Sequence, residues 1–465
     1  MNKKIGIVIT DGVGYRNFIL SDFLNQVVGN FEEVIIYSGL SKKVYNGLNF
    51  QNIKIYELDV YKESKKAWFF RRINEQAHLF KYKSFFGMQD TLQMTKPKGF
   101  TKRDILNRVI RSFVSVFHSD KNMILYQQLL FKSLSENNLT KQLIKVITEH
   151  KPDLLFFTHQ RPPYIAPLAY AAKTNNIKTC SFIFSWDNLA SKGRMPVLFD
   201  YFLVWSDLMK EELQYFYPSV KQEVIHVVGT PQFEPYVMDK YKLSKSDFFT
   251  TFGIDSKKKT ICFSCGDNVT GINDELSIEI IAKAIQSDKL LEKVNLIVRT
   301  SPADDGSKFN KLIDKYTFIS WNKPKWQLTR ENHPEPWSQR IPLKQDIKEL
   351  RAILEYSDLS INMCSTMSLD FMLFDKPVIN TVFGNKENGL YNDQKFLNFI
   401  HYKYVVNSNA VTVAKNEKEL HKYILEAMEY PSKRSKYRKE LLELEIGKPL
   451  KGTSIQVVNG LKSMI

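Results

Sequence analysis

The stretch Asp358-Leu-Ser-Ile-Asn-Met-Cys-Ser-Thr-Met-Ser-Leu-Asp370, continued by Phe-Met-Leu-Phe-Asp-Lys-Pro-Val-Ile-Asn380, decides the fold. Its pattern predicts a buried strand over Leu359–Asn362, a polar turn, a short helix and a second strand. Ser365 and Thr366 stand where the helix begins, so two hydroxyls and free backbone N–H groups converge at the positive end of the helix dipole. Such a turn can hold the phosphates of a nucleotide diphosphate without a metal ion.

The residues that follow this turn fit the same interpretation. Asp370 comes one helical turn later, within reach of a ribose hydroxyl, and Asp375-Lys-Pro377 ends the helix before the next strand. The alternative is that Ser365 only caps the helix, because serine is a common N-cap residue.

Four segments between residues 200 and 380 resemble the nucleotide-sugar-binding half of GT-B glycosyltransferases. In chain order they are Phe202–Leu213, Val227–Glu234, Leu296–Pro302 and the Ser365-Thr366 segment with Asp375-Lys-Pro-Val378. The resemblance is to the branch that includes CDP-glycerol glycerophosphotransferases and other bacterial surface-polysaccharide transferases, and the first 150 residues match only in general layout. Members that use glycerol phosphate or CMP-sugars carry Arg-x-His-Pro where this chain has Arg299-Thr-Ser-Pro302, which argues against those two substrates.

Strand and helix patterns alternate along the whole chain, which is typical of parallel sheets with helices on both faces. The alternation begins with a strand at Ile5–Thr10 and restarts at Thr260, after a polar passage from Lys242 to Lys259. It predicts an α/β fold of two Rossmann-like, doubly wound domains, whose ligands bind beyond the carboxyl ends of the strands. The resemblance implies the GT-B arrangement, in which the domains face a cleft and a C-terminal helix crosses back to the N-terminal domain.

The breaks in the pattern give the expected domain bounds. An N-terminal acceptor-binding domain covers residues 1–240 and contains a basic, aromatic helical insertion over about 61–148. A nucleotide-sugar-binding domain covers 241–430, and a helical segment at 431–465 packs on the N-terminal domain. The stretch from Trp321 to Trp337, rich in Trp and Pro, is expected to be a loop near the cleft.

The composition indicates a folded cytoplasmic protein. The 465 residues suffice for two cores, and Cys262-Phe-Ser-Cys265 lies in a predicted buried strand without a second pair, so structural thiols in a reducing compartment are expected. The first strand is too short for a signal-peptide core, and no apolar run could span a bilayer. We expect the protein to be cytoplasmic, either free or peripheral on the inner face of the cytoplasmic membrane.

Half of the formal charge of +16 lies in one part of the chain. Residues 61–120 contain thirteen Lys and Arg against five Asp and Glu, a net +8, between Trp and Phe side chains. Cations among bulky rings suit an anionic membrane or a lipid-linked pyrophosphate, so residues 62–117 are predicted to contact one of these. No nucleic-acid motif is present, so nucleic acid is not expected as a partner. The alternative is a packed insertion that buries its rings and exposes its cations.

Three loops that follow strands of the first domain hold candidate catalytic residues. Asp11 lies in Thr10-Asp-Gly-Val-Gly14, and the resemblance implies that this loop faces the cleft and supplies the base that activates the acceptor. His159 and Asp187 follow two later strands and compete for the same role. Alternatively, Asp11 caps a helix and Asp187 hydrogen-bonds the backbone of its own loop.

The second domain holds the expected nucleotide-sugar site. Gly266 and Asn268 follow its first strand, where a phosphate could approach the backbone, and Arg299 could pair with the diphosphate in a bidentate manner. The alternative partner of Arg299 is Asp304 or Asp305. Together with Ser365, Thr366 and Asp370, these residues are the predicted donor-binding set.

No Asp-x-Asp motif stands where a metal for the diphosphate would lie, so neither a metal nor a cofactor is expected. The resemblance also bears on stereochemistry: the carboxylate pair that marks many retaining GT-B enzymes is absent near Asp370, which favours inversion.

These patterns and the resemblance predict a glycosyltransferase. It would move a sugar from a nucleotide-diphosphate sugar to a glycan or polyprenyl-linked acceptor in bacterial cell-surface polysaccharide biosynthesis. The same fold also serves glycerophosphotransferases and UDP-sugar 2-epimerases. The alternative from another class is a non-catalytic, membrane-associated scaffold, which need not bind UDP, CDP or GDP.

Overall fold

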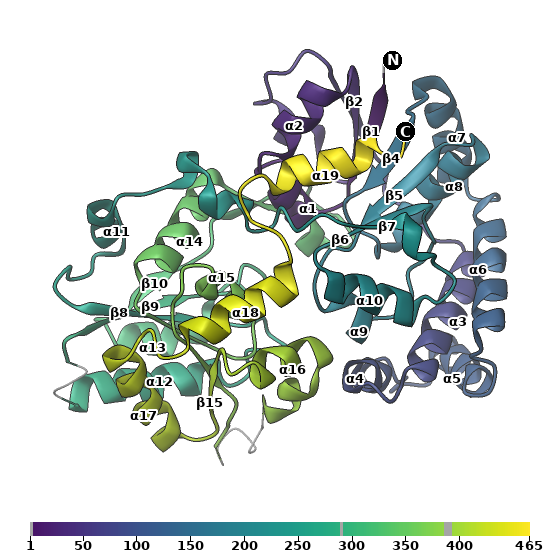
Figure 1. The fold of residues 1–465 in the computed structure, drawn as a ribbon. Helices are drawn as coiled ribbons and strands as arrows, with labels where there is room; N and C mark the ends of the chain where they lie inside the picture. The colour runs from purple at the N-terminus through teal and green to yellow at the C-terminus, as the bar shows by residue number, and fades with distance from the viewer. Residues whose placement is uncertain (1–2, 289–291, 386–392) are drawn as a thin grey trace. The chain divides into compact units, whose positions relative to one another are not determined.

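The computed structural model describes residues 3–288, 292–385 and 393–465. The chain forms two compact units (Figure 1). The first consists of Met1–Glu234, Leu328–Ile341 and Glu445–Ile465, and the second of Pro235–Gln327 and Pro342–Leu444. Each unit is built around its own parallel sheet. Among the described helices, none has both the length and the apolar character needed to cross a bilayer.

The first unit contains a seven-stranded parallel sheet in the order β3-β2-β1-β4-β5-β6-β7. Its strands are β1 (Lys4–Ile9), β2 (Glu33–Ser38), β3 (Ile53–Glu57), β4 (Leu154–Phe157), β5 (Lys178–Phe182), β6 (Tyr201–Val204) and β7 (Ile225–Val227). The central strands are apolar and buried on both faces, as expected for a sheet covered by helices on each side. The strand order reverses between β1 and β4, which is where doubly wound sheets bind ligands.

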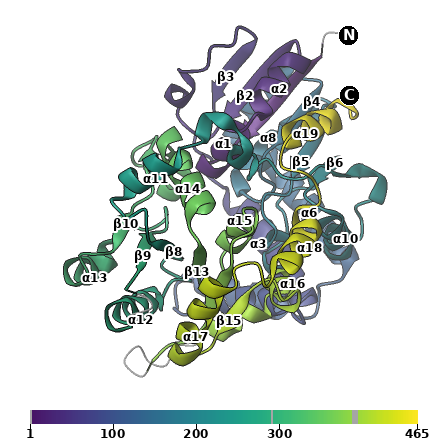
Figure 2. The same ribbon diagram turned by 60° about the vertical axis from the view of Figure 1, so that its left-hand side comes forward.

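Among the described residues, eleven α-helices of the first unit surround or extend this sheet. They are α1 (Gly12–Phe18), α2 (Phe23–Asn30), α3 (Lys65–Lys81), α4 (Phe86–Met94), α5 (Lys102–Val114), α6 (Asp120–Leu134), α7 (Asn138–His150), α8 (Ala166–Thr174), α9 (Asn188–Ser191), α10 (Asp207–Phe216) and α19 (Thr453–Lys462). The last of them, α19, packs against α2 (Figure 2). The end of the chain therefore belongs to the unit that begins it.

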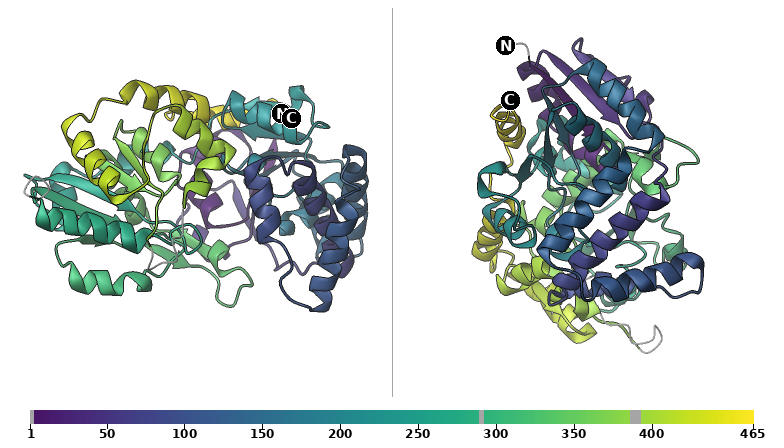
Figure 3. Two further views of the ribbon diagram at one scale, coloured as in Figure 1. Left: turned by 90° about the horizontal axis from the view of Figure 1, so that it is seen from below. Right: turned by 90° about the vertical axis from the view of Figure 1, so that its right-hand side faces the viewer.

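The helices α3 to α6 form an insertion with a core of its own. The long helix α3 packs against α4, α5 and α6 (Figure 3). The buried side chains between them are Ile73, Ala77, Ile110, Val114, Met123 and Tyr126, with Trp68, Phe69 and Phe80 packed against this cluster. The rings of α3 are thus already used in packing.

The second unit contains a six-stranded parallel sheet in the order β10-β9-β8-β13-β14-β15. Its strands are β8 (Lys259–Ser264), β9 (Val294–Arg299), β10 (Ser320–Asn322), β13 (Leu359–Asn362), β14 (Val378–Thr381) and β15 (Thr412–Ala414). Its helices are α11 (Lys245–Phe252), α12 (Asp274–Ser287), α13 (Asn310–Lys315), α14 (Lys344–Tyr356), α15 (Met367–Met372), α16 (Ile400–Asn407), α17 (Glu417–Glu429) and most of α18 (Ser435–Ile446). The strand order reverses between β8 and β13, so this sheet has a switch point of its own.

The predicted α/β fold with two doubly wound sheets is confirmed. Three bounds differ from those expected. The second unit begins at Pro235 rather than near residue 241, and only the part of 431–465 from Glu445 onward belongs to the first unit. The stretch Leu328–Ile341, expected as a plain loop, also belongs to the first unit and is flanked by the short paired strands β11 (Trp326–Leu328) and β12 (Arg340–Pro342).

Candidate functional site

Asp11 and His159 form a hydrogen-bonded pair at the switch point of the first sheet. The strands that precede them are neighbours, with Val8 opposite Phe157, so the two loops leave the sheet side by side. His159 Nδ1 lies 3.1 Å from Asp11 Oδ2. An imidazole that donates its Nδ1 proton to a carboxylate has a free lone pair on Nε2. Asp11 therefore favours the tautomer in which Nε2 can accept a proton.

The carboxylate of Asp11 is buried and ionised. Burial alone would raise its pKa, but the hydrogen bond and charge of His159, the N–H of Gly14 and the hydroxyl of Thr10 together lower the pKa below its usual value. Asp11 Oδ1 accepts the backbone N–H groups of Val13 (3.0 Å) and Gly14 (2.8 Å) at the start of α1, and Thr10 Oγ1 donates to Oδ2 at 2.8 Å. One oxygen thus caps the helix while the other holds His159.

The imidazole of His159 is fixed on its second side by an aromatic ring. It stacks on Phe184, with ring centroids 4.0 Å apart and an angle of 16° between the planes. Within the described residues its Nε2 is buried and has no hydrogen-bond partner. A buried polar atom without a partner costs free energy, so a ligand hydroxyl that donates to Nε2 would be stabilised there.

A cavity of about 300 Å³ adjoins this pair. Its walls come from the strand-following loops, from α3 and from the stretch Leu328–Ile341; they include Asp11, His159, Arg161, Phe184, Glu75, Glu335 and Trp337. In the part of the chain that the structure describes, Arg161 forms no ion pair. The cavity is large enough for a sugar-sized group, and its wall carries the cation Arg161 and three carboxylates, those of Asp11, Glu75 and Glu335.

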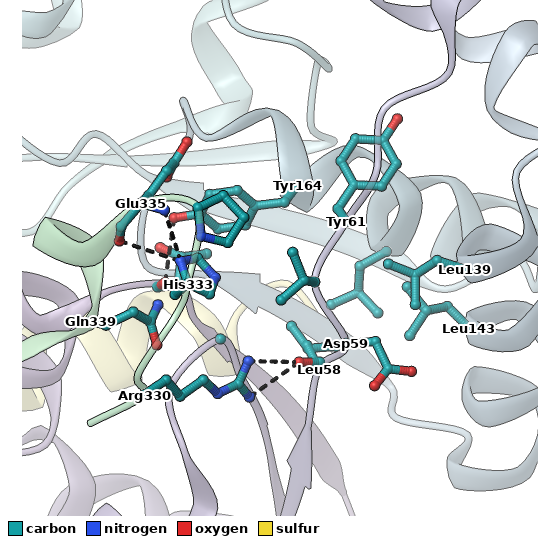
Figure 4. Close-up of a pocket in the computed structure, with 15 residues that line it drawn as sticks. Leu58, Asp59, Tyr61, Leu139, Leu143, Tyr164, Arg330, His333, Glu335 and Gln339 are labelled. Atoms are coloured by element: carbon teal, nitrogen blue, oxygen red, sulfur yellow. Dashed lines mark hydrogen bonds between the residues drawn. The ribbon is translucent and has the colours of Figure 1, made fainter. Parts of the chain in front are cut away.

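A smaller cavity of about 70 Å³ shares Tyr164 and Glu335 with the larger one. Figure 4 shows Arg330 and Gln339 on one side of it and Leu139 and Leu143 of α7 on the other. Arg330 donates from both terminal nitrogens to the carbonyl oxygen of Leu58 at 3.2 Å and pairs with Glu57 at 2.8 Å. These contacts anchor the stretch Leu328–Ile341 to the edge of the first sheet.

Gly12 shows how closely this stretch approaches the first loop. A Cβ atom on Gly12 would lie 1.5 Å from the backbone oxygen of Arg340. Only glycine therefore fits at this position. Glu335 and Trp337, which the same stretch brings to the cavity, were not among the predicted site residues, because nothing in the sequence links them to Asp11.

Asp187 does not line the larger cavity. Its Oδ1 accepts a hydrogen bond from the side chain of Asn188 at 3.0 Å, and its Oδ2 lies 3.4 Å from Lys192 Nζ. Gln160 donates to Asn188 at 3.1 Å and so ties this loop to the one that carries His159. These contacts tie Asp187 to side chains of its own loop, whereas the alternative expected bonds to the backbone of that loop.

In the second unit, the predicted strand, turn and helix are present around Ser365. Cys364 adopts a left-handed conformation with φ +45°, which reverses the chain after β13. Ser365 Oγ accepts the N–H of Met367 at 3.2 Å, and the N–H of Ser365 donates to Asn362 Oδ1 at 3.0 Å. Thr366 is the N-cap residue of the short helix α15.

A network of buried polar side chains stabilises this turn. Asn362 Oδ1 also accepts Ser368 Oγ at 3.1 Å and Asn380 Nδ2 at 3.0 Å, and Tyr402 bonds to both of these residues. The turn is therefore fixed by side chains that do not themselves reach the surface.

The loop after β8 emerges beside this turn, because Ser264 pairs with Asn362 in neighbouring strands. A Cβ atom on Gly266 would lie 2.7 Å from Thr270 Oγ1 and 2.8 Å from the backbone nitrogen of Gly271, so the loop closes tightly on this glycine. Asn268 is exposed in the same loop. Gly266, Asn268, Ser365 and Thr366 thus gather at the switch point of the second sheet.

Arg299 and Asp370 require a correction. Arg299 is buried, donates to both oxygens of Asp346 at 3.0 Å and also bonds to Asn322, so neither a free diphosphate contact nor a bridge to Asp304 or Asp305 describes it. Asp370 is also buried, and its Oδ1 accepts the hydroxyl of Tyr236. Both residues therefore make buried contacts that stabilise the second unit. Within the described residues, no cluster of three His, Cys, Asp or Glu side chains could hold a metal ion.

Asp274 should make the stability of the second unit depend on pH. Its Oδ2 accepts the N–H of Gly266 at 2.9 Å, and burial, opposed by Lys308, raises its pKa to about 7. The folded state then binds a proton that the unfolded chain, with a pKa of about 3.9, releases. The stability contributed by this group is complete below about pH 4 and is lost as the pH rises to about 7.

We expect Asp274→Asn, which keeps an acceptor for Gly266, to reduce the fall in unfolding free energy between about pH 5 and pH 7.5. Denaturant titrations at the two pH values measure it. The control is the exposed neighbour Glu275, because Glu275→Gln should leave the change of unfolding free energy with pH as it is in the parent. Equal slopes for Asp274→Asn and the parent would contradict the prediction.

Comparison with known proteins bears on the fold. No protein-family model matches the chain, and no curated protein matches it in sequence. A putative UDP-N-acetylglucosamine 2-epimerase from Listeria monocytogenes is similar in structure, with a TM-score of 0.56 at 10% identity over 100% of this chain and 97% of that chain. UDP-GlcNAc 2-epimerase from Neisseria meningitidis, solved with UDP-GlcNAc bound, gives 0.55 at 12% identity over 99% and 100%.

A glycosyltransferase from Rickettsia africae gives a TM-score of 0.51 at 12% identity over 99% of this chain and 98% of that chain. At such identities the likeness shows the fold, which is the GT-B fold of two Rossmann-like units. The finer resemblance to the CDP-glycerol branch gains no support from these structures and stays a prediction.

Proposed function

We propose that the protein is a glycosyltransferase that moves a sugar from a nucleotide-diphosphate sugar to an acceptor hydroxyl in bacterial cell-surface polysaccharide biosynthesis. The observation that supports it best is the Asp11–His159 pair beside a cavity of about 300 Å³. In this proposal the acceptor is a glycan or a polyprenyl-linked glycan, and the enzyme works in the cytoplasm.

The proposed base is His159, and Asp11 is its positioning residue. The acceptor hydroxyl donates its hydrogen bond to Nε2 of His159 and its oxygen attacks the anomeric carbon of the donor sugar. As the new C–O bond forms, the proton passes to Nε2 and the nucleoside diphosphate leaves with the electrons of the broken bond. The ionised carboxylate of Asp11 stabilises the imidazolium that results. Attack opposite the leaving group inverts the anomeric centre.

The second unit supplies the donor site in this proposal. At its switch point the hydroxyls of Ser365 and Thr366 offer donors for a diphosphate, and the neighbouring Gly266 loop has its own N–H of Gly266 bonded to Asp274. Arg299 and Asp370 act indirectly, because they fix the strand and helix that carry these loops. Neither a metal ion nor a cofactor takes part in the proposed reaction.

A nucleotide screen tests the donor site. We expect UDP, CDP or GDP, or one of their sugars, to raise the melting temperature of the protein, and the double variant Ser365→Ala/Thr366→Ala to bind that nucleotide about 10- to 100-fold more weakly, because two hydroxyls that bond to an anion are lost. Isothermal titration calorimetry measures the affinity.

The control is Ser287→Ala, since within the described residues the hydroxyl of Ser287 donates to the carbonyl of Lys283 in its own helix. If the double variant binds the nucleotide as tightly as the parent does, Ser365 caps the helix and does not bind the diphosphate. If no nucleotide binds the parent, the non-catalytic scaffold is the better interpretation.

Product analysis separates glycosyl transfer from epimerisation. Incubation of the nucleotide sugar that binds, without any acceptor, should leave its C2 configuration unchanged and release free sugar only slowly. Accumulation of the C2 epimer under these conditions would assign the protein to the epimerases, whose fold it shares.

A further inference from the structure

The helix α5 and the turn after it present apolar side chains to solvent. Ten of the twenty-three large apolar side chains that are exposed in the described residues fall between Met94 and Leu125. Six of these form what we call the α5 stripe: Ile105, Leu106, Val109, Phe113, Val116 and Phe117. Val109 is 59% exposed and Val116 is 72% exposed. Soluble surfaces rarely gather so many apolar side chains without a partner.

The α5 stripe occupies one side of a helix. At 3.6 residues per turn its members fall within about 120° around the helix axis. Val116 and Phe117 continue the helical turn by bonding to the carbonyl of Phe113, and the rings of Phe113 and Phe117 stack with centroids 4.8 Å apart. The adjoining side of α5 already packs into the insertion through Ile110 and Val114. The stripe is therefore a second apolar face that folding of the insertion leaves open.

Cations precede the α5 stripe in the loop before α5 and at the first residue of the helix. Lys96, Lys98 and Lys102 are exposed, and within the described residues none of them forms an ion pair. Between them stands Phe100, which is 85% exposed and lies under the guanidinium of Arg108, 4.8 Å from its ring centroid. An exposed ring and unpaired lysines are thus presented next to the stripe in the chain.

We propose that the α5 stripe and the loop 96–102 dock the protein onto an anionic lipid bilayer. Apolar side chains of an amphipathic helix enter the boundary between headgroups and acyl chains, and the lysines pair with anionic headgroups. The docking surface is narrower than the whole basic stretch 62–117, because Trp68, Phe69 and Phe80 are packed in the insertion. This inference concerns attachment alone and does not rest on the proposed transfer reaction.

The charge and composition of the surface favour a lipid bilayer over a second copy of the chain or a nucleic acid. In a symmetric dimer the same surface of both copies would meet, which would bring two sets of these lysines into one interface, and like charges repel. Nucleic acid is recognised by flat rings and donors that meet bases, whereas the stripe is mainly Ile, Leu and Val, which cannot stack on bases. An anionic bilayer meets both the apolar and the cationic parts at once.

Sedimentation with vesicles tests the proposal. The full chain should bind vesicles of phosphatidylcholine with about 30% phosphatidylglycerol and should bind less as the salt concentration rises. Val109→Ser/Phe113→Ser should lower the partition coefficient about tenfold or more, and Lys98→Gln/Lys102→Gln should lower binding to the anionic vesicles only.

Matched variants control for general effects of exposed residues. Ile455→Ser removes an apolar side chain of 43% exposure from α19, and Lys141→Gln/Lys145→Gln removes two exposed lysines from α7. Both should bind vesicles as the parent does, and so should His159→Ala. Thermal unfolding confirms that the α5 variants are folded, which their exposed positions favour.

Three outcomes overturn the proposal. They are no sedimentation of the parent with anionic vesicles at low salt, equal loss of binding in the stripe variants and in their matched controls, and a dimer in sedimentation velocity that Val109→Ser/Phe113→Ser abolishes while vesicle binding is absent. The last result would assign the stripe to a second copy of the chain.

Discussion

His159→Ala is expected to lower the turnover number by roughly two to four orders of magnitude while the affinity for the nucleotide sugar stays unchanged. The alanine removes the Nε2 atom that would take the acceptor proton, but it leaves the donor site in the second unit intact. Turnover is measured as release of nucleoside diphosphate in the presence of acceptor, and donor affinity by calorimetry.

Asp11→Asn separates positioning from proton transfer. The asparagine keeps a side-chain oxygen for the N–H groups of Val13 and Gly14, so the cap of α1 remains, but it loses the charge that stabilises an imidazolium. Turnover should fall by less than in His159→Ala. Added imidazole should restore part of the turnover of His159→Ala, because the substitution enlarges the cavity beside Asp11, and it should not restore that of Asp11→Asn.

The control for a histidine substitution is His421→Ala, since His421 pairs with Asp288 in the second unit. That variant should turn over at the parent's rate. Parental turnover in His159→Ala, together with loss of transfer in Asp187→Asn at unchanged donor affinity, would move the base to the loop that carries Asp187.

The largest effect on stability is expected from Asp346→Ala, which should lower the unfolding free energy by about 3–5 kcal/mol. Asp346 accepts two hydrogen bonds from the buried guanidinium of Arg299, one from the N–H of Lys325 and one from the indole of Trp326. Its removal leaves a positive charge buried without its counter-ion. Chemical denaturation followed by fluorescence or circular dichroism measures the change.

An exposed pair gives the comparison. Glu440→Ala breaks the contact between Lys436 and Glu440, whose side chains are 83% and 56% exposed, and should change the unfolding free energy by less than about 1 kcal/mol. A similarly small loss in Asp346→Ala would mean that water or another group compensates Arg299.

The strands with continuous apolar runs could be predicted from the sequence, and the edge strands could not. β1, β4 and β13 are buried on both faces, so their pattern is unmistakable. β3 lies at the edge of its sheet and is only partly buried, so it has no continuous apolar run. β10 and β15 are edge strands of three residues, too short to produce a periodic signal.

The sequence predicted individual residues of the candidate site, but not which of them contact each other, because those contacts depend on the order of the strands. Asp11 and His159 were competing candidates because 148 positions separate them, and only the pairing of β1 with β4 brings them together. For Arg299 the sequence offered the nearby Asp304 and Asp305, whereas its partner Asp346 comes from α14. Long-range contacts of this kind leave no local pattern in a single sequence.

The three-part composition of the first unit has a consequence for synthesis on the ribosome. Glu234, near the end of the first part, accepts the N–H of Ser454 at 3.1 Å, and α19 packs on α2. The wall of the larger cavity that carries Glu335 and Trp337 is made much later than the loops it faces, since Glu335 comes 176 positions after His159 and 324 after Asp11. N-terminal domains usually fold while the rest of the chain is still being made. Here a nascent chain that stops before Leu328 would carry Asp11 and His159 but not the wall with Glu335 and Trp337, so the candidate site is complete only once that stretch has been made.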